Sequence, residues 1–152
     1  MPVFSGEYTS ALDDKNRIII PARLRQAAGP EGVAGYYVMR GIDDCIVIQT
    51  AARFEGTGSS EADSRIRQTA AGRMLERAIY SKAEFGKSDK QGRFLLPARL
   101  VQDLHLGRQV AIIGVNDRIE VWDPETWKRV DREAQAQRQK RAEEIYGNPK
   151  EA

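Results

Sequence analysis

The sequence predicts an α+β fold made of two tandem copies of one structural unit. Residues 13–24 read DDKNRIIIPARL and residues 89–100 read DKQGRFLLPARL, so six identical residues recur at a separation of 76 positions. Farther along the chain, residues 37–48 resemble residues 110–121 at a separation of 73 positions. An internal repeat of this kind indicates that both halves have the same local structure.

Each copy is expected to begin with two short strands joined by a tight turn. The turns are 13–16 and 89–92, where an Asp can hydrogen-bond to nearby backbone and Asn16 or Gly92 can adopt a positive φ. The apolar runs 18–20 and 94–96 follow these turns and predict short strands that are buried on both faces, or nearly so.

A short helix follows the second strand of each copy. Pro21 and Pro97 suit the first helical position, because the N–H that proline lacks would have no partner there. The predicted helices, 22–28 and 98–106, end before a Gly, the residue most common just past a helix end. The first copy then has three extra residues, which fit in the Gly- and Pro-rich loop 29–35.

Two further strands joined by a second turn complete each copy. These turns are expected at 43–44 and 116–117. Thr50 and Asp123 follow the last strands and are candidate N-caps for the next helices.

Two helices are expected outside the repeat. Residues 60–79 have apolar residues at three-to-four spacing, which predicts an amphipathic helix with one apolar stripe. Residues 124–146 predict a highly charged helix with a thin apolar side, and residues 147–152 predict a frayed tail.

Composition indicates a soluble globular protein and argues against several classes of function. The chain has 152 residues, a net charge of +2, one Cys and one His, so a disulfide framework or a Cys/His zinc site cannot form within one chain. The N-terminus does not resemble a signal peptide and no run is long enough to span a membrane, which predicts a cytoplasmic protein. No cofactor motif or catalytic constellation is found, and we expect no enzyme, cofactor, metal or small-molecule substrate. Cys45 is expected to be a buried apolar residue and His105 to lie at a helix end.

The repeated turns carry a local excess of basic residues. Segment 13–25 has four basic residues against two acidic ones, and segment 89–99 has three against one. Two such loops predict a phosphate-binding surface, and Arg can also fork onto a guanine edge. The candidate DNA-binding residues are Lys15, Arg17, Arg23, Arg25, Lys90, Arg93 and Arg99.

Other interpretations of these residues stay open. Asp13 and Asp89 stand four residues before an Arg, and each Asp–Arg pair alone is equally consistent with a brace across the turn. The basic residues of the terminal helix fit a solvated face with i,i+4 pairs better than a DNA contact. Trp122 and Trp127 are expected to pack in the core.

The doubled Asp-x-x-x-Arg turn, each copy followed by an apolar triplet and Pro, resembles MraZ, a family of bacterial transcriptional regulators with tandem SpoVT/AbrB-type domains. The segment EVWDPETW at 120–127 also resembles the second domain of that family. The resemblance implies one pseudo-twofold β-barrel made of two swapped-hairpin half-barrels, with peripheral helices and a C-terminal helix. The implied domains are 4–56 and 80–127, with a connecting helix at 57–79 and a C-terminal helix and tail at 128–152.

The resemblance also implies a function. It implies a ring of identical chains, associated with the nucleoid, that binds double-stranded DNA at direct repeats upstream of the division and cell-wall gene cluster and usually represses its own operon. The motif Arg corresponds to Arg17 and Arg93, the motif Asp to Asp13 and Asp89, and the internal basic position to Lys15. Gln91 takes that basic position in the second copy, where Lys90 stands one residue earlier. The second loop is therefore expected either to meet DNA differently or to serve mainly in assembly, and Arg17 is the stronger candidate for a base contact.

Two other classes of function remain as alternatives. One is an antitoxin-like AbrB-fold protein whose main partner is a toxin, although such proteins usually have one domain copy and an acidic tail. The other is a purely structural ring with no role on DNA.

Overall fold

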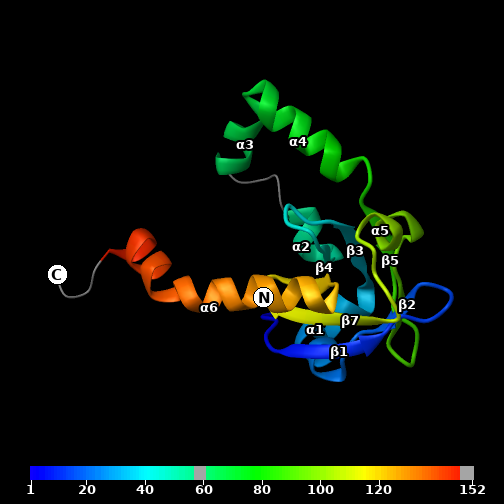
Figure 1. Ribbon diagram of the computed structural model, residues 1–152. Coiled ribbons are helices and arrows are strands. Elements are labelled where there is room, and N and C mark those ends of the chain that lie inside the picture. Colours follow the sequence, from blue (N-terminus) through cyan, green and yellow to red (C-terminus); the bar gives the residue numbers. More distant parts are fainter. Residues whose placement is uncertain (57–60, 148–152) are drawn as a thin grey trace.

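The computed structural model describes residues 1–56 and 61–147, which form antiparallel β-sheets with helices around them (Figure 1). The first copy contributes four strands and a helix: β1 (Glu7–Ala11), β2 (Arg17–Ile19), α1 (Ala22–Ala34), β3 (Tyr36–Arg40) and β4 (Ile46–Thr50). The second copy contributes the equivalent set: β5 (Glu84–Gly86), β6 (Arg93–Leu95), α5 (Ala98–Asp103), β7 (Gln109–Val115) and β8 (Arg118–Trp122). The remaining helices are α2 (Ala51–Gly56), α3 (Glu61–Arg67), α4 (Ala70–Tyr80) and α6 (Pro124–Tyr146).

The two copies exchange strands. One sheet has the order β1-β7-β8-β4-β3-β5 and the other consists of β2 and β6, with every pair antiparallel. The first strand of each copy therefore pairs with the third strand of the other copy. Swapping the two copies reverses the order of the large sheet and leaves it otherwise unchanged, so the topology has an internal twofold symmetry.

The expected closed barrel is not found among the described strands. β1 and β5 are the two edges of the large sheet, and β2 and β6 form a separate ribbon of three residues per strand. Each of these short strands ends close before a proline, Pro21 or Pro97, which has no N–H with which to continue a ladder. The fold class is therefore α+β with two antiparallel sheets rather than one continuous barrel.

Both copies contribute to one main core. Equivalent residues of the two copies lie together in it, such as Ile18 with Phe94 and Leu24 with Leu100, all at most 3% exposed. Tyr36 meets the edge of Phe94 with ring centroids 5.7 Å apart. Because the core is shared, neither copy can bury its apolar residues without the other.

A second, smaller cluster lies where α6 begins. Cys45 and Trp122 are buried in it, and Trp127 and Val130 of α6 pack against it. Trp127 Nε1 also donates a hydrogen bond to Glu7 of β1, at 2.8 Å. The expected core positions of Cys45 and Trp122 are thus confirmed, and Trp127 attaches the start of α6 to the sheet.

Several predicted helix boundaries differ from the structure. α1 does not end at Gly29 but bends there, at φ 55° and ψ −139°, and continues to Ala34. α5 ends at Asp103, and His105 just beyond it has a φ of 51°. Pro21 and Pro97 occupy the N-caps of α1 and α5, one position earlier than expected, because their ψ angles of 141° and 129° are extended rather than helical. Thr50 and Asp123 are confirmed as caps: the Thr50 hydroxyl accepts from the backbone of Arg53, and the Asp123 carboxylate accepts from that of Thr126.

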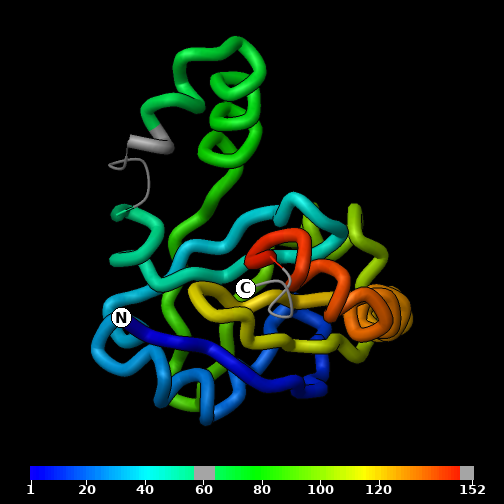
Figure 2. Tube along the Cα trace, turned by 90° about the vertical axis from the view of Figure 1, so that its left-hand side faces the viewer, coloured from blue at the N-terminus to red at the C-terminus, as the bar shows by residue number. Residues whose placement is uncertain are grey.

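The amphipathic helix expected at 60–79 is two helices, α3 and α4. The first helix ends at Arg67, and Thr69 caps the second: its hydroxyl accepts a hydrogen bond from the backbone N–H of Gly72 at 2.9 Å. The helices cross so closely there that a Cβ on Gly72 would stand 1.7 Å from the Ile66 carbonyl oxygen. The pair stands away from the sheets in both views (Figures 1 and 2), and no residue of α4 is buried. Ser60 and the predicted tail from 148 onward lie outside the described residues.

α6 has the predicted bounds, from Pro124 to Tyr146. Its second half extends beyond the sheet, away from the end where the loops before β2 and β6 project (Figure 1). In the part of the chain that the structure describes, no helix combines the length and the apolar character needed to cross a membrane.

Candidate nucleic-acid interface

The turn before β2 is organised around the Asp13 carboxylate. One carboxylate oxygen accepts hydrogen bonds from the backbone N–H groups of Lys15 and Arg17, at 2.9 and 2.8 Å. The other oxygen accepts from Nε of Arg17 at 2.8 Å. Asn16 adopts a φ of 61°, which Asn tolerates better than most residues. The turn is thereby fixed by one side chain that contacts both backbone and guanidinium.

The turn before β6 repeats this geometry. Asp89 accepts from the backbone of Gln91 and Arg93, both at 2.9 Å, and from Nε of Arg93 at 2.7 Å. Gly92 supplies the positive φ, 85°. A side chain on Gly92 would collide with the Arg25 guanidinium, since its Cβ would be 2.7 Å from Nε of Arg25. The two turns therefore differ in sequence between Asp and Arg but not in hydrogen bonding.

These contacts lower the pKa of both carboxyl groups. For Asp13 and Asp89 the largest cause is the hydrogen bond from the backbone N–H of the motif Arg, and the guanidinium hydrogen bond adds to it. Both carboxylates therefore stay ionised at neutral pH and hold their Arg partners in place.

The Asp contact orients each guanidinium without occupying all of its donors. Arg17 and Arg93 bind the Asp through Nε, and no hydrogen bond from their terminal Nη groups is found within the described residues. Their side chains are 31% and 39% exposed. An Arg held at Nε in this way can still present its two Nη groups to an external acceptor.

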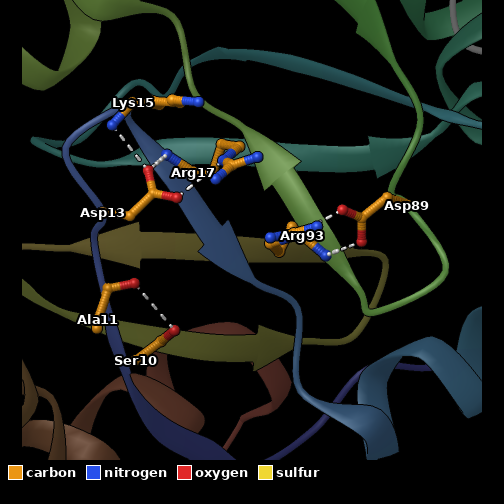
Figure 3. A network of polar contacts seen from close by, with 7 residues as sticks. All are labelled: Ser10, Ala11, Asp13, Lys15, Arg17, Asp89 and Arg93. Atoms are coloured by element: carbon orange, nitrogen blue, oxygen red, sulfur yellow. Dashed lines mark hydrogen bonds and ion pairs between the residues drawn. The ribbon is translucent and has the colours of Figure 1, made fainter.

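The ribbon formed by β2 and β6 brings both turns onto one surface. Ile18 pairs with Phe94 at its centre, Arg17 lies opposite Leu95, and Ile19 lies opposite Arg93. Figure 3 shows the two Asp–Arg pairs on these neighbouring strands. Lys15 and Lys90 are exposed in the turns themselves. Four of the predicted residues and the two Asp side chains therefore belong to this ribbon or to the turns at its two ends.

The other three predicted residues have different surroundings. Arg25 donates a hydrogen bond to the Ile20 carbonyl at 2.9 Å, and its guanidinium packs against the second turn at Gly92. Arg99 hydrogen-bonds to the Lys82 carbonyl and lies 3.6 Å from Glu84, at the start of β5. Arg23 is exposed near the start of β1, where it lines a cavity with Val3, Ser5 and Tyr8. Arg23 and Arg99 thus lie away from the ribbon and its turns.

Sequence reasoning missed one basic residue beside the first turn. Arg108 is exposed, its carbonyl accepts from the Leu12 backbone at 2.8 Å, and it lines a groove of about 540 Å³ with Asp13 and Asn16. Its position depends on the pairing of β1 with β7, which joins residues about a hundred positions apart. No local signal could have found it.

The comparisons with known proteins agree with this architecture. The sequence model of the MraZ protein family, which is described as antitoxin-like, matches residues 3–77 and 79–148, so each copy is matched separately. The chain belongs to the MraZ family. A Lactiplantibacillus plantarum protein named transcriptional regulator MraZ is 37% identical over 134 residues, 88% of this chain and 92% of the relative.

Two further MraZ relatives have similar identity and coverage. A Finegoldia magna protein is 36% identical over 128 residues, 84% of this chain and 85% of the relative. A Moorella thermoacetica protein is 32% identical over 147 residues, 94% of this chain and 96% of the relative. Both are also named transcriptional regulator MraZ, a name that describes regulation and no enzymatic activity.

Proposed function

We propose that this chain is a transcriptional regulator that binds double-stranded DNA through the two Asp–Arg turns. The observation that carries the proposal is the presence of two equivalent turns on one exposed ribbon, each presenting an oriented Arg. Membership of a family whose relatives are named transcriptional regulators supports the same function.

The charge and geometry of the turns suit DNA. A fixed guanidinium with accessible Nη groups can bind a phosphate or the O6 and N7 acceptors of guanine. Lys15 and Lys90 add exposed positive charge to each turn, and Arg108 adds it beside the first. Because Lys15 lies next to the Arg–Asp contact whereas Gln91 takes its place in the second copy, we assign the base contact to Arg17 first.

We further propose that several copies act together on DNA as a ring. A single chain offers only two small turns, and joining several chains raises the effective concentration of each turn at repeated sites. The free end of α6 and the α3–α4 pair project away from the turns (Figure 1), so contacts between copies there would leave the turns uncovered. The strand exchange between copies supports two tandem AbrB-type domains, 4–56 and 80–127, that together supply what a dimer of single domains would.

The proposed target is a set of direct repeats upstream of the division and cell-wall gene cluster, with repression of the chain's own operon. A gel shift with the region upstream of its own coding sequence tests this. We expect the wild-type chain to shift this duplex, with affinity that falls steeply as salt rises. Arg17→Ala should strongly weaken the shift while the oligomer, measured by size-exclusion chromatography, stays intact.

Arg40→Ala is the matched control for this experiment. Arg40 also pairs with an Asp at i+4 across a turn between antiparallel strands, at 3.1 Å from Asp44, but the β3–β4 turn lies elsewhere on the molecule. Arg40→Ala should bind as the wild type does. Equal binding by the wild type and Arg17→Ala would contradict the assignment of the site.

The second candidate function is toxin binding, as the antitoxin-like description of the family suggests. The exposed apolar side chains of α4, Met74 at 70% and Leu75 at 46%, would suit a protein partner. Purification from the native host distinguishes the two functions. A small protein recovered in equal amounts, together with no shift of the upstream duplex, would favour the antitoxin.

A further inference from the structure

The outer face of the β2–β6 ribbon carries two large apolar side chains. Successive residues of a strand point to opposite faces, so Arg17 and Ile19 share one face of β2, and Arg93 and Leu95 share one face of β6. Ile18 and Phe94 point the other way, into the core, and are 1% exposed. The four outer side chains form a square in which each apolar residue lies directly opposite an Arg.

Both apolar residues are exposed to solvent, against the expectation from sequence. Ile19 is 50% exposed and Leu95 is 62% exposed, whereas their neighbours Ile20 and Leu96 are at most 1% exposed. A single exposed aliphatic residue would need no explanation. Two that occupy equivalent positions of the repeat, at diagonal corners of a square whose other two corners are arginines, indicate a binding surface.

The surroundings of this apolar pair identify the ligand by its charge. Arg17 and Arg93 occupy the other two corners of the square, and Lys15 and Lys90 lie in the turns at the two ends of the ribbon, so the ligand has to offer acceptor atoms and apolar groups together and negative charge on either side of them. The DNA major groove has this pattern: it is about 12 Å wide, admits a two-stranded β-ribbon, and displays the thymine C5-methyl group between the two phosphate backbones.

We infer that Ile19 and Leu95 contact thymine methyl groups in the major groove while Arg17 and Arg93 bind the flanking guanines or phosphates. This inference rests on the proposed DNA-binding function and adds a source of sequence specificity to it. The twofold symmetry of the ribbon places Ile19 and Leu95 in equivalent positions. The contacted thymines are therefore expected in pairs, one on each DNA strand.

Replacing thymine by uracil tests the inference, because uracil lacks only the methyl group. The probe is the duplex of the region upstream of the chain's own coding sequence, with each thymine replaced in turn, and binding is measured by fluorescence anisotropy. At the contacted positions we expect uracil to weaken wild-type binding about fourfold, the effect of removing one buried methyl.

The variants Ile19→Ala and Leu95→Ala link each methyl to a residue. Each should bind the unmodified duplex more weakly than the wild type, and each should lose the uracil sensitivity at one position of a pair, as in a double-mutant cycle. Because at least half of each side chain is already in water, both variants should unfold within a few degrees of the wild type. The control is Ile42→Ala: Ile42 is 87% exposed in the turn between β3 and β4, and this variant should keep every uracil effect.

Three results would overturn the inference. The first is that no thymine-to-uracil replacement changes wild-type binding, and the second is that both alanine variants keep the full uracil sensitivity. The third is that the variants bind DNA normally but change oligomeric size, which would make the ribbon face a contact between copies. If Arg17→Ala still loses binding in these cases, the DNA-binding proposal stands and only the methyl contact falls. A wild-type chain that does not bind the upstream duplex at all contradicts both.

Discussion

The alternation of buried and exposed residues along β6 predicts effects of very different size for two adjacent substitutions. Phe94 is 1% exposed in the core that both copies share, and its ring meets Tyr36. Phe94→Ala removes a fully buried ring and leaves a cavity, which lowers the free energy of unfolding by about 3–5 kcal/mol. Leu95→Ala should lower it by less than about 1 kcal/mol, since 62% of that residue is already in water.

Urea unfolding followed by circular dichroism measures both effects. With an m-value of about 2 kcal/mol per molar urea for a chain of this size, Phe94→Ala should lower the unfolding midpoint by about 2 M. Leu95→Ala should shift the midpoint by less than about 0.5 M. Both variants are compared at one protein concentration, because assembly stabilises the folded chain. Equal shifts for the two variants would contradict the burial pattern, and with it the shared core and the outward face of the ribbon.

Three further predictions concern single groups. The carboxyl groups of Asp13 and Asp89 should titrate below the ordinary Asp pKa of 3.8 in NMR. Because the pKa of each carboxyl group is lowered in the folded state, the contribution of these groups to stability is complete above pH 3.8 and is lost as the pH falls through the folded-state pKa. A measured pKa at or above 3.8 would contradict the hydrogen bonding of the turns. Burial, with smaller effects from nearby carboxylates, raises the pKa of the Cys45 thiol to about 12. A disulfide reagent at about pH 8 should therefore modify the unfolded chain rapidly and the folded chain slowly. Equal rates of modification would contradict the burial of Cys45. Gly92→Ala should lower the free energy of unfolding by about 1–3 kcal/mol, because residue 92 has a positive φ and lies beside the Arg25 guanidinium. Gly107→Ala, with open space around it, should change the free energy of unfolding little. An unchanged free energy of unfolding for Gly92→Ala would contradict the geometry of the second turn.

Local signals in the sequence predicted the elements well. The repeat gave the same order of strands and helix in both copies, and Asn16 and Gly92 have the positive φ expected of their turns. Thr50 and Asp123 cap helices because their side-chain oxygens satisfy free backbone N–H groups at the next turn. Each of these features depends on residues within a few positions of one another.

Features that depend on distant contacts could not be predicted from residue patterns. The run Ile18–Ile20 has no polar residue to mark an outward face, so Ile19 was expected to be buried; the pairing with β6 turns it to the surface. The apolar pattern at three-to-four spacing continues across the boundary between α3 and α4, so it predicts one helix instead of two. The apolar residues of this pattern on α4 are not buried. The assignment of DNA-binding roles to the seven basic residues remains a prediction. The structure groups Lys15, Arg17, Lys90 and Arg93 around the ribbon, places Arg25 below the second turn, and leaves Arg23 and Arg99 farther away.

The claim that the Asp–Arg turns read DNA is tested most directly by the specificity of Arg17→Ala. Fluorescence anisotropy gives the affinities of the wild type, Arg17→Ala and Arg40→Ala for the upstream duplex and for a shuffled duplex of the same composition. Loss of a bidentate base contact costs about 1–3 kcal/mol, so Arg17→Ala should lose roughly 5- to 150-fold in affinity for the upstream duplex and much less for the shuffled one. A ratio of the two affinities that is the same for Arg17→Ala, Arg40→Ala and the wild type would contradict the account.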